Sequence, residues 1–299
     1  MRNVERTGTA APSLPPQLTP EYLRAKVAEA LTEDLGPEGH DLTTEAVVPA
    51  GLAAKAHLKA GEAGMVAGLM VAQEVFRQVD PEIAFRSLTA DGSPIEPGDV
   101  LAEVRGPLRG LLAAERTALN FLQQLSGVAT LTRRYVQRAT SAGPAVVVLD
   151  TRKTAPGLRP LQRYAVRCGG GGNHRYNLAD VVLIKDNHVA AAGGVAEAVR
   201  RARRCGLPVE IEVDDLEQLE AALGEGPEAI LLDNMSPAQV AEAVRRTRGR
   251  ALLEVSGGVT LAAVAAYAAT GVDRISVGSL THSAPAIDIS MEVIETWEA

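Results

Sequence analysis

The second half of the chain alternates short apolar segments with helix-like segments, and this alternation restricts the fold more than any other feature. The six apolar segments are VVVLDTRK, VVLIKDNH, VEIEVDD, AILLDN, LLEVSGG and RISVGS. Stretches with helical spacing, such as GGVAEAVRRARRCG and SPAQVAEAVRRTRG, separate them. A strand, a helix and a further strand form a right-handed crossover, which makes consecutive strands parallel. The pattern predicts an α/β parallel sheet, either open or closed into a barrel, with fewer than the eight units of a complete barrel.

The first half of the chain has a different pattern. A Pro-containing tail is followed by EYLRAKVAEALTEDLG, which has helical spacing and ends at a glycine. Residues 52–106 are predicted to form short strands and turns around one helix, GLMVAQEVFRQVD. A long helical segment, LRGLLAAERTALNFLQQLSGVATLTRRYVQRAT, follows, with a break expected near Ser126 and Gly127. We expect a small α+β domain that this segment connects to the parallel sheet.

Composition excludes several functional classes. No segment approaches the roughly 20 continuous apolar residues of a membrane span, and the opening residues lack the apolar centre of a secretion signal. Cys168 and Cys205 are far apart and lack metal-type spacing. The net charge of -7 and the pI near 5.4 argue against nucleic-acid binding. We therefore expect a cytoplasmic protein without nucleic-acid or membrane partners, in which local cations bind any anionic ligand.

Every predicted strand of the second half ends in polar or glycine residues. These ends are Asp150-Thr151-Arg152-Lys153, Lys185-Asp186-Asn187-His188, Glu212-Val213-Asp214, Asp233-Asn234, Ser256-Gly257-Gly258 and Gly278-Ser279. In parallel α/β folds these ends lie on one face, where active sites are built. The sequence therefore predicts a site on this face.

Five cations belong to this face: Arg152, Lys153, His174, Arg175 and Lys185. The loop CGGGGNHRYN supplies two of them, and its glycines allow the backbone to approach a ligand closely. Arginine suits bidentate contact with carboxylate or phosphate, while lysine acts as a compact charge. An isolated Arg-Lys pair is more often simply solvated, and a lone histidine more often has its hydrogen bonds satisfied in a core or loop. Their grouping favours an anion site.

Two carboxylates, Glu212 and Asp233, lie in apolar strands, where a buried unpaired charge is costly. Each needs a cation, which is either a lysine, Lys153 or Lys185, or a metal ion. The two-residue period puts Glu210 and Glu212 on one strand face. Mg²⁺ is typically held by one or two carboxylates together with substrate phosphates, so sparse ligation suits it.

Glycines follow the last two strands, at Gly257 and Gly258 and at Gly278. In barrel enzymes these two loops often bind phosphate through backbone amides. Ser256 and Ser279 add hydroxyl groups. One such loop is a weak signal, but two on the final strands favour a phosphate site.

The motifs of the chain resemble those of one known family, the quinolinate phosphoribosyltransferases, also called carboxylating nicotinate-nucleotide pyrophosphorylases. The motifs are AERTALNFLQ, LDTRKTAPGLR, GGGGNHR, LIKDNH, IEVD, LLDN, EVSGG and SVGSLTHSAP. They occur in the order of the family and cover most of the chain from about residue 50 to its end.

The resemblance implies a fold and a reaction. The fold is an N-terminal α+β sandwich domain (residues 19–128, with 285–299 returning to it) and an incomplete α/β barrel of about six parallel strands (129–284). The Pro-containing residues before it, 1–18, are expected from their composition to be a disordered tail. The reaction joins quinolinate to phosphoribosyl pyrophosphate with Mg²⁺ and gives nicotinate mononucleotide, CO2 and pyrophosphate for NAD biosynthesis.

The resemblance also implies residue roles. Arg152, His174, Arg175 and Lys185 resemble the group that holds the quinolinate carboxylates. Lys153 resembles a residue that shares in substrate or pyrophosphate binding. Glu212 and Asp233 resemble the acidic pair near the ribose and the metal. Ser256, Gly257 and Gly278 resemble contacts of the 5′-phosphate. We count Lys153, Lys185, Glu212 and Asp233 as catalytic candidates, and the two lysines are candidates for the final proton donor.

Arg116 belongs to the motif AERTALN, which the family places across a dimer interface to complete the neighbouring site. The resemblance therefore implies a homodimer or a higher homo-oligomer. From the residues alone, Arg116 is as well explained as an exposed helix arginine. Two other functions remain open: phosphoribosyl transfer to nicotinate or a similar anionic ring without decarboxylation, and phosphosugar binding without catalysis. Release of CO2 from quinolinate distinguishes decarboxylating transfer to quinolinate from both of these alternatives.

Overall fold

The computed structural model describes residues 12–298 of the chain, which forms two compact units. The first contains the residues up to Leu131, Gly157–Gly170 and the C-terminal segment from Ala284; the second contains Thr132–Pro156 and Gly171–Ser283. Of the predicted disordered tail, residues 1–11 lie outside the described part, and Leu18 is buried. None of the described helices combines the length and apolar character that crossing a bilayer requires.

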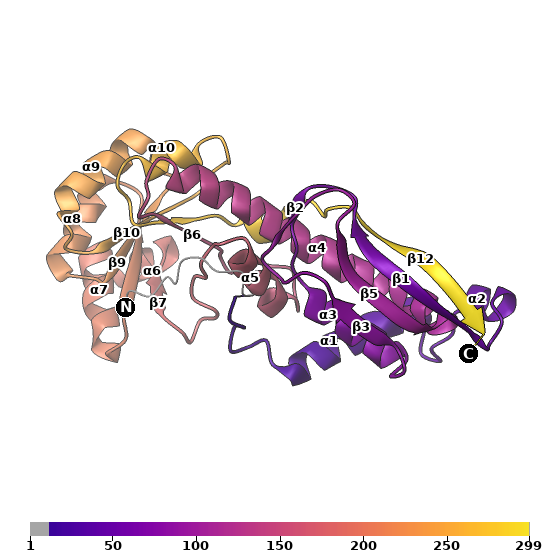
Figure 1. Cartoon of the computed structure of the whole chain (residues 1–299). Helices are drawn as coiled ribbons and strands as arrows, with labels where there is room; N and C mark the ends of the chain where they lie inside the picture. The colour runs from indigo at the N-terminus through magenta and orange to yellow at the C-terminus, as the bar shows by residue number, and fades with distance from the viewer. Residues whose placement is uncertain (1–11, 299) are drawn as a thin grey trace. The chain divides into compact units, whose positions relative to one another are not determined.

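The first unit is built on an antiparallel sheet with the strand order β12-β1-β5-β3. These strands are β1 (Leu52–Ala60), β3 (Ala84–Ser87), β5 (Val100–Pro107) and β12 (Ile289–Glu298). Burial alternates along most of β1, as expected for a sheet with one face on a core. Figure 1 shows β12, from the C-terminus, beside β1. The chain therefore returns to its first unit to complete this sheet.

The first unit also contains two helices that pack on each other, α1 (Pro20–Leu35) and α3 (Leu69–Val79). Its shorter elements are α2 (Leu42–Val47), α5 (Arg159–Cys168) and the two-stranded sheet of β2 (Gly64–Met65) and β4 (Pro94–Ile95). The α1 helix begins at the Thr19 side chain, which accepts a hydrogen bond from the Tyr22 amide. Its buried residues, Val27 and Leu31, are four residues apart and share one face.

The long helix α4 (Leu108–Thr140) is continuous, so the predicted break near Ser126 and Gly127 is wrong. A Cβ at Gly127 would lie 2.0 Å from the Pro285 carbonyl oxygen. The glycine is thus present for a close approach of the backbone rather than for a turn. The Ser126 hydroxyl binds the backbone of Ala67 in both directions. Packing within the first unit explains both helix-disfavouring residues.

The second unit contains the six predicted parallel strands. They are β6 (Val147–Leu149), β7 (Val182–Ile184), β8 (Val209–Val213), β9 (Ala229–Asp233), β10 (Leu252–Ser256) and β11 (Arg274–Ser276). Their order is β6-β11-β10-β9-β8-β7, and every adjacent pair is parallel. The sheet ends at β6 on one side and at β7 on the other, so the barrel is incomplete. The predicted fold class is confirmed.

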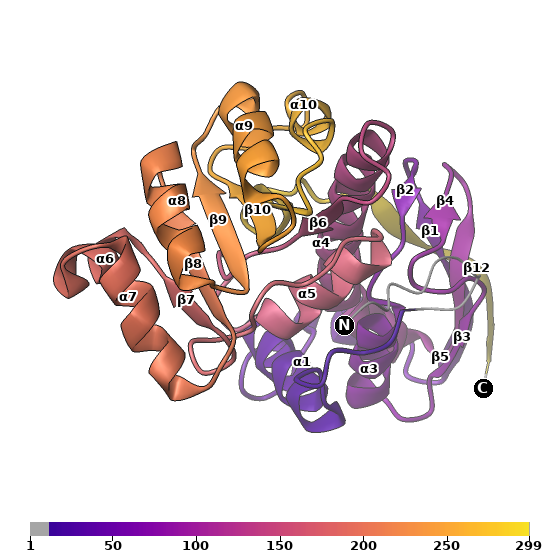
Figure 2. The ribbon, with the colours of Figure 1, turned by 90° about the vertical axis from the view of Figure 1, so that its left-hand side faces the viewer.

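Helices follow the strands of the second unit as the alternation predicts. They are α6 (Asp186–Ala192), α7 (Val195–Ala202) with the 3₁₀ turn Arg203–Cys205, α8 (Leu216–Glu225), α9 (Pro237–Thr247), α10 (Val264–Ala268) and α11 (Ser279–His282). Figure 2 shows α7, α8 and α9 side by side along the sheet. Side-chain caps at Asp215 and Ser236 begin α8 and α9 directly after the polar strand ends. Each helix therefore turns away and leaves those ends accessible.

Candidate active site

A pocket lies at the C-terminal ends of the strands in the second unit. The predicted site residues that line it are Arg152, Lys153, His174, Arg175, Lys185, Glu212, Asp233, Ser256 and Gly257. Gly278 lines an adjoining pocket, which shares Lys153, Ser256 and Gly257 with the first. Arg116 is exposed on α4, in the first unit. The second unit thus brings all the predicted site residues except Arg116 to one face.

The buried carboxylate of Asp150 positions the loop that carries His174 and Arg175. Asp150 is 0% exposed and accepts hydrogen bonds from Asn173 Nδ2 at 2.6 Å and from the His174 amide at 2.9 Å. Gly172 also pairs with β6, because its amide donates to the Val148 carbonyl at 2.8 Å. A Cβ there would lie 2.7 Å from Leu149 Cδ2. The glycine therefore lets the loop lie against the strand.

The positive charges of Arg152 and Arg175 repel each other in the pocket. Burial, and secondly the nearby charge of Arg152, lower the pKa of Arg175 below the ordinary arginine value. The Arg175 guanidinium donates to the Val181 carbonyl at 3.1 Å. An anion between the two guanidinium groups would relieve their repulsion and replace the water lost by burial.

The carboxylates lie beside the lysines on the same face. Lys185 Nζ donates to Glu212 Oε2, so the lysine partner that the sequence left open is Lys185. Burial raises the pKa of Asp233, and Asp214 and Asp186 add to this, while Lys185 and Lys153 oppose it. Asp233 also accepts from Asn234 Nδ2 at 2.6 Å. A divalent cation beside Asp233 would lower that pKa again, which fits a metal at this edge.

A cluster of His174, Glu210 and Glu254 lies deeper on this face. His174 Nε2 is 3.3 Å from Glu210 Oε2 and 3.2 Å from Glu254 Oε1. Burial lowers the pKa of His174, but both carboxylates raise it and prevail. The sequence reasoning gave Glu254 no role and placed Glu210 only on a strand face. The one signal was that each acid interrupts an apolar strand, two residues before another polar position.

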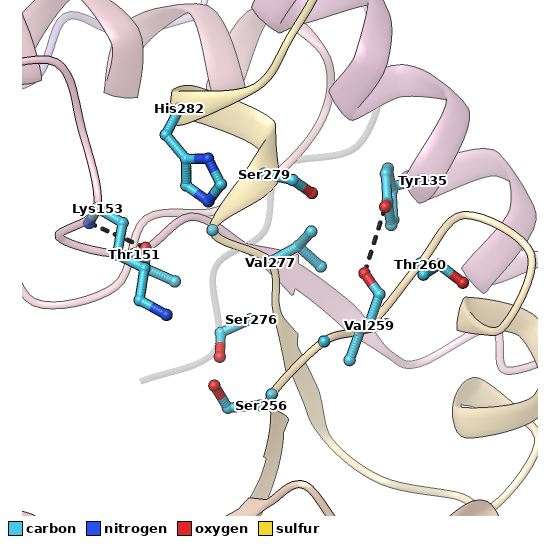
Figure 3. Close-up of a pocket in the computed structure, with 13 residues that line it drawn as sticks. Tyr135, Thr151, Lys153, Ser256, Val259, Thr260, Ser276, Val277, Ser279 and His282 are labelled. Carbon is cyan, nitrogen blue, oxygen red and sulfur yellow. Dashed lines mark hydrogen bonds between the residues drawn. The ribbon is translucent and has the colours of Figure 1, made fainter.

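The adjoining pocket is lined by the loops after β10 and β11 (Figure 3). Tyr135 Oη donates to the Val259 carbonyl at 3.3 Å, and Thr281 Oγ1 donates to the Lys153 carbonyl at 2.8 Å. Small hydroxyl residues, glycines and Lys153 surround the space, as expected for a phosphate. Thr151, Ser276 and His282 also line this pocket, although the sequence analysis gave them no role. THS within the motif SVGSLTHSAP was the available signal for His282.

Gly257 is expected to tolerate no side chain. Its φ is +95°, and a Cβ would lie 2.2 Å from Asn234 Oδ1, which is part of the site. Gly257→Ala should reduce the free energy of unfolding by about 1–3 kcal/mol and should impair activity, as measured by urea unfolding and turnover. Gly258→Ala is the matched control, because φ is also positive there (+59°) but no atom lies within 4 Å. Equal effects at both positions would contradict the steric argument.

Comparisons with known proteins identify close relatives. The family model described as "Quinolinate phosphoribosyl transferase, N-terminal domain" matches residues 41–126, and the corresponding C-terminal domain model matches residues 128–292. A nicotinate-nucleotide pyrophosphorylase [carboxylating] of Mycobacterium leprae (strain TN) is 48% identical over 277 residues, covering 90% of this chain and 96% of the relative. A probable enzyme of that name from Bacillus subtilis (strain 168) is 40% identical over 264 residues, covering 87% and 90%. The structure of the nicotinate-nucleotide pyrophosphorylase from Francisella tularensis has a TM-score of 0.88 at 38% identity, covering 96% of this chain and 100% of that one.

Proposed function

Because the chain belongs to the quinolinate phosphoribosyltransferase family, we propose that it transfers a phosphoribosyl group to quinolinate with decarboxylation. The products are nicotinate mononucleotide, CO2 and pyrophosphate, and the reaction serves NAD biosynthesis. The observation that carries the proposal is the pair of adjoining pockets at the strand ends, which gather cations, carboxylates and a glycine-rich site suited to phosphate.

The cationic side of the pocket suits the two carboxylates of quinolinate. Arg152 and Arg175 lie close enough for mutual repulsion, which a dicarboxylate relieves. Lys185 provides a third charge and lines the same pocket. We assign these three residues, with His174 beside Arg175, to quinolinate. The negative net charge of the whole chain would repel such a ligand, so the local cations have to bind it.

The glycine-rich side suits phosphoribosyl pyrophosphate. Ser256, Gly257 and Gly278 are assigned to its 5′-phosphate, and Lys153, which lines both pockets, to the pyrophosphate. Glu212 and Asp233 would hold the ribose hydroxyls or Mg²⁺, because both carboxylates line the pocket beside the phosphate side. Bound Mg²⁺ would neutralise charge on the departing pyrophosphate.

The reaction needs mainly orientation from these residues. The ring nitrogen of quinolinate forms a bond to C1 of the ribose as the bond from C1 to pyrophosphate breaks. Glu212 or Asp233 stabilises the positive charge that develops on the ribose. The product ring is a pyridinium, whose positive nitrogen stabilises the electron pair that stays on the neighbouring ring carbon when the carboxylate leaves as CO2. A proton then replaces it on the ring, and Lys153 and Lys185 are the candidate donors.

The assembly and location of the enzyme extend this proposal. We propose a homodimer or a higher homo-oligomer, in which exposed Arg116 completes the site of a neighbouring subunit. We also place the enzyme in the cytoplasm, where its free cysteines, Cys168 and Cys205, would stay reduced.

Carbon dioxide release is the direct test of the proposed function. Purified protein with quinolinate, phosphoribosyl pyrophosphate and Mg²⁺ should release CO2 and nicotinate mononucleotide in equal amounts. Chelation of Mg²⁺ should abolish this, and added Mg²⁺ should restore it. Product formation from nicotinate in place of quinolinate would instead support transfer without decarboxylation. No turnover of either ring, with phosphoribosyl pyrophosphate still bound, would indicate a phosphosugar-binding protein.

A further inference from the structure

Two buried glutamates, which the proposed reaction does not use, approach one ring nitrogen of His174. Glu210 on β8 is 4% exposed and Glu254 on β10 is 0% exposed. The strand β9 separates β8 and β10 in the sheet, and His174 contacts both carboxylates. We propose that Glu210 and Glu254 are positioning residues, which hold the His174 ring through its Nε2 proton and thereby fix the Arg175 loop for quinolinate binding. This inference rests on the proposed function.

The carboxylates of Glu210 and Glu254 have few hydrogen-bond partners. Within the described part of the chain, Glu210 Oε1 and both oxygens of Glu254 have no hydrogen-bond partner of good geometry. His174 Nε2 lies within ion-pair distance of both acids. Burying charged groups with so few partners costs free energy that a purely structural element would avoid. We attribute this unfavourable burial to the neighbouring binding site, which requires the His174 ring to be held in place.

The amide of Arg175 determines which ring nitrogen carries the proton. It donates to His174 Nδ1 at 2.7 Å, so Nδ1 acts as an acceptor and has no proton. The neutral ring then carries its proton on Nε2, between the two carboxylates. The two carboxylates favour a second proton on the ring, which would have to bind Nδ1. The Arg175 amide opposes a proton at that position.

This tautomer also decides between a proton and a metal ion at the cluster. The ligand atoms of His174, Glu210 and Glu254 all lie within 4.8 Å of one another, as in a metal site. A metal on Nε2 would require the ring proton to be on Nδ1. The Arg175 amide occupies that position. The three side chains are therefore arranged around the Nε2 proton of His174 rather than around a metal ion.

A ring held at both nitrogens fixes the loop that carries Arg175. The His174 amide is bound by Asp150 at the end of β6, while the ring contacts β8 and β10. Arg175 is thus tied to three strands before a ligand arrives. Cations that are already in place bind an anion without paying for reorganisation. Loss of either glutamate should weaken the quinolinate side of the pocket and spare the phosphate side.

Steady-state kinetics with both substrates tests this division. Glu254→Gln and Glu210→Gln should raise the KM for quinolinate about 10- to 100-fold and leave the KM for phosphoribosyl pyrophosphate nearly unchanged. Glu242→Gln, in an exposed ion-pair group on α9, is the matched control and should change neither KM. Equal increases in both KM values would overturn the inference, because they would indicate general damage to the fold.

A double-mutant cycle tests whether the glutamates act through His174. If they do, Glu254→Gln should add little to the quinolinate KM of His174→Ala, whereas independent effects would multiply. Multiplication would overturn the inference.

A measurement on the wild-type protein covers the case in which the variants do not fold. Nitrogen-15 NMR of the histidine rings should show a protonated Nε2 on His174 that is protected from solvent exchange. An unprotonated Nε2, as metal binding would give, would overturn the inference. The NMR result does not depend on turnover. An inactive wild-type protein would refute the proposed function, and the protonation of His174 Nε2 would still test the inference about the glutamates.

Discussion

Replacing Arg175 with alanine is expected to reduce kcat/KM for quinolinate at least about 100-fold, or about 2.7 kcal/mol, mainly through a higher KM. The guanidinium is partly buried and close enough to Arg152 for their charges to repel, so it is prepared for an anion. Removing one partner of a desolvated charge pair typically costs about 2–5 kcal/mol. The measurement is the steady-state rate of CO2 release as a function of quinolinate concentration.

Two further variants separate charge from geometry in this prediction. Arg175→Lys keeps a positive charge but loses the planar fork of donors, so its KM should lie between those of the wild type and the alanine variant. Arg201→Ala is the control, because this arginine is exposed on α7 and pairs with Glu197. It should have wild-type kinetics. Near-normal quinolinate kinetics in a folded Arg175→Ala protein would remove Arg175 from the site.

The strands of the second unit were predictable because each is a short apolar run that ends in polar residues. Their parallel direction followed from the intervening helices, and the shared direction placed the polar ends on one face. The order of the strands could not be predicted in this way. The pairing of β6 with β11, whose first residues are 127 positions apart in the chain, is a long-range contact that no local pattern indicates. For the same reason no local signal showed that Gly157–Gly170 groups with the first unit.

The cations of the site were more predictable than their partners. A glycine-rich loop containing His174 and Arg175 stands out in the sequence, and a strand-end lysine such as Lys185 does so as well. The contacts of His174 with Glu210 and Glu254 depend on a loop reaching across three strands, which no periodicity encodes. The prediction of a helix break at Gly127 was wrong for a similar reason. A glycine is needed there because the distant segment at Pro285 approaches the helix closely. Local patterns thus identified the candidate site, and tertiary contacts determined how its residues are held.

Subunit mixing is expected to restore activity that two separate variants lack. Arg116→Ala should inactivate the enzyme if Arg116 completes a neighbouring site, and Lys185→Ala should inactivate it by removing a cation from the pocket. In a heterodimer of the two chains, one site combines Lys185 of one subunit with Arg116 of the other and is intact. Random mixing makes about half of the dimers mixed. The mixture should therefore recover about a quarter of wild-type activity, measured as CO2 release after co-refolding or subunit exchange.

The stoichiometry makes this experiment decisive for a shared site. If Arg116 acted within its own subunit, each chain of a heterodimer would keep its own defect, and mixing would restore nothing. The two chains therefore carry different affinity tags, and tandem purification isolates the heterodimers before the assay. Purified heterodimers should reach about half of wild-type activity, because one of their two sites is complete. Inactive heterodimers of verified composition would show that the exposed arginine on α4 does not serve the neighbouring subunit.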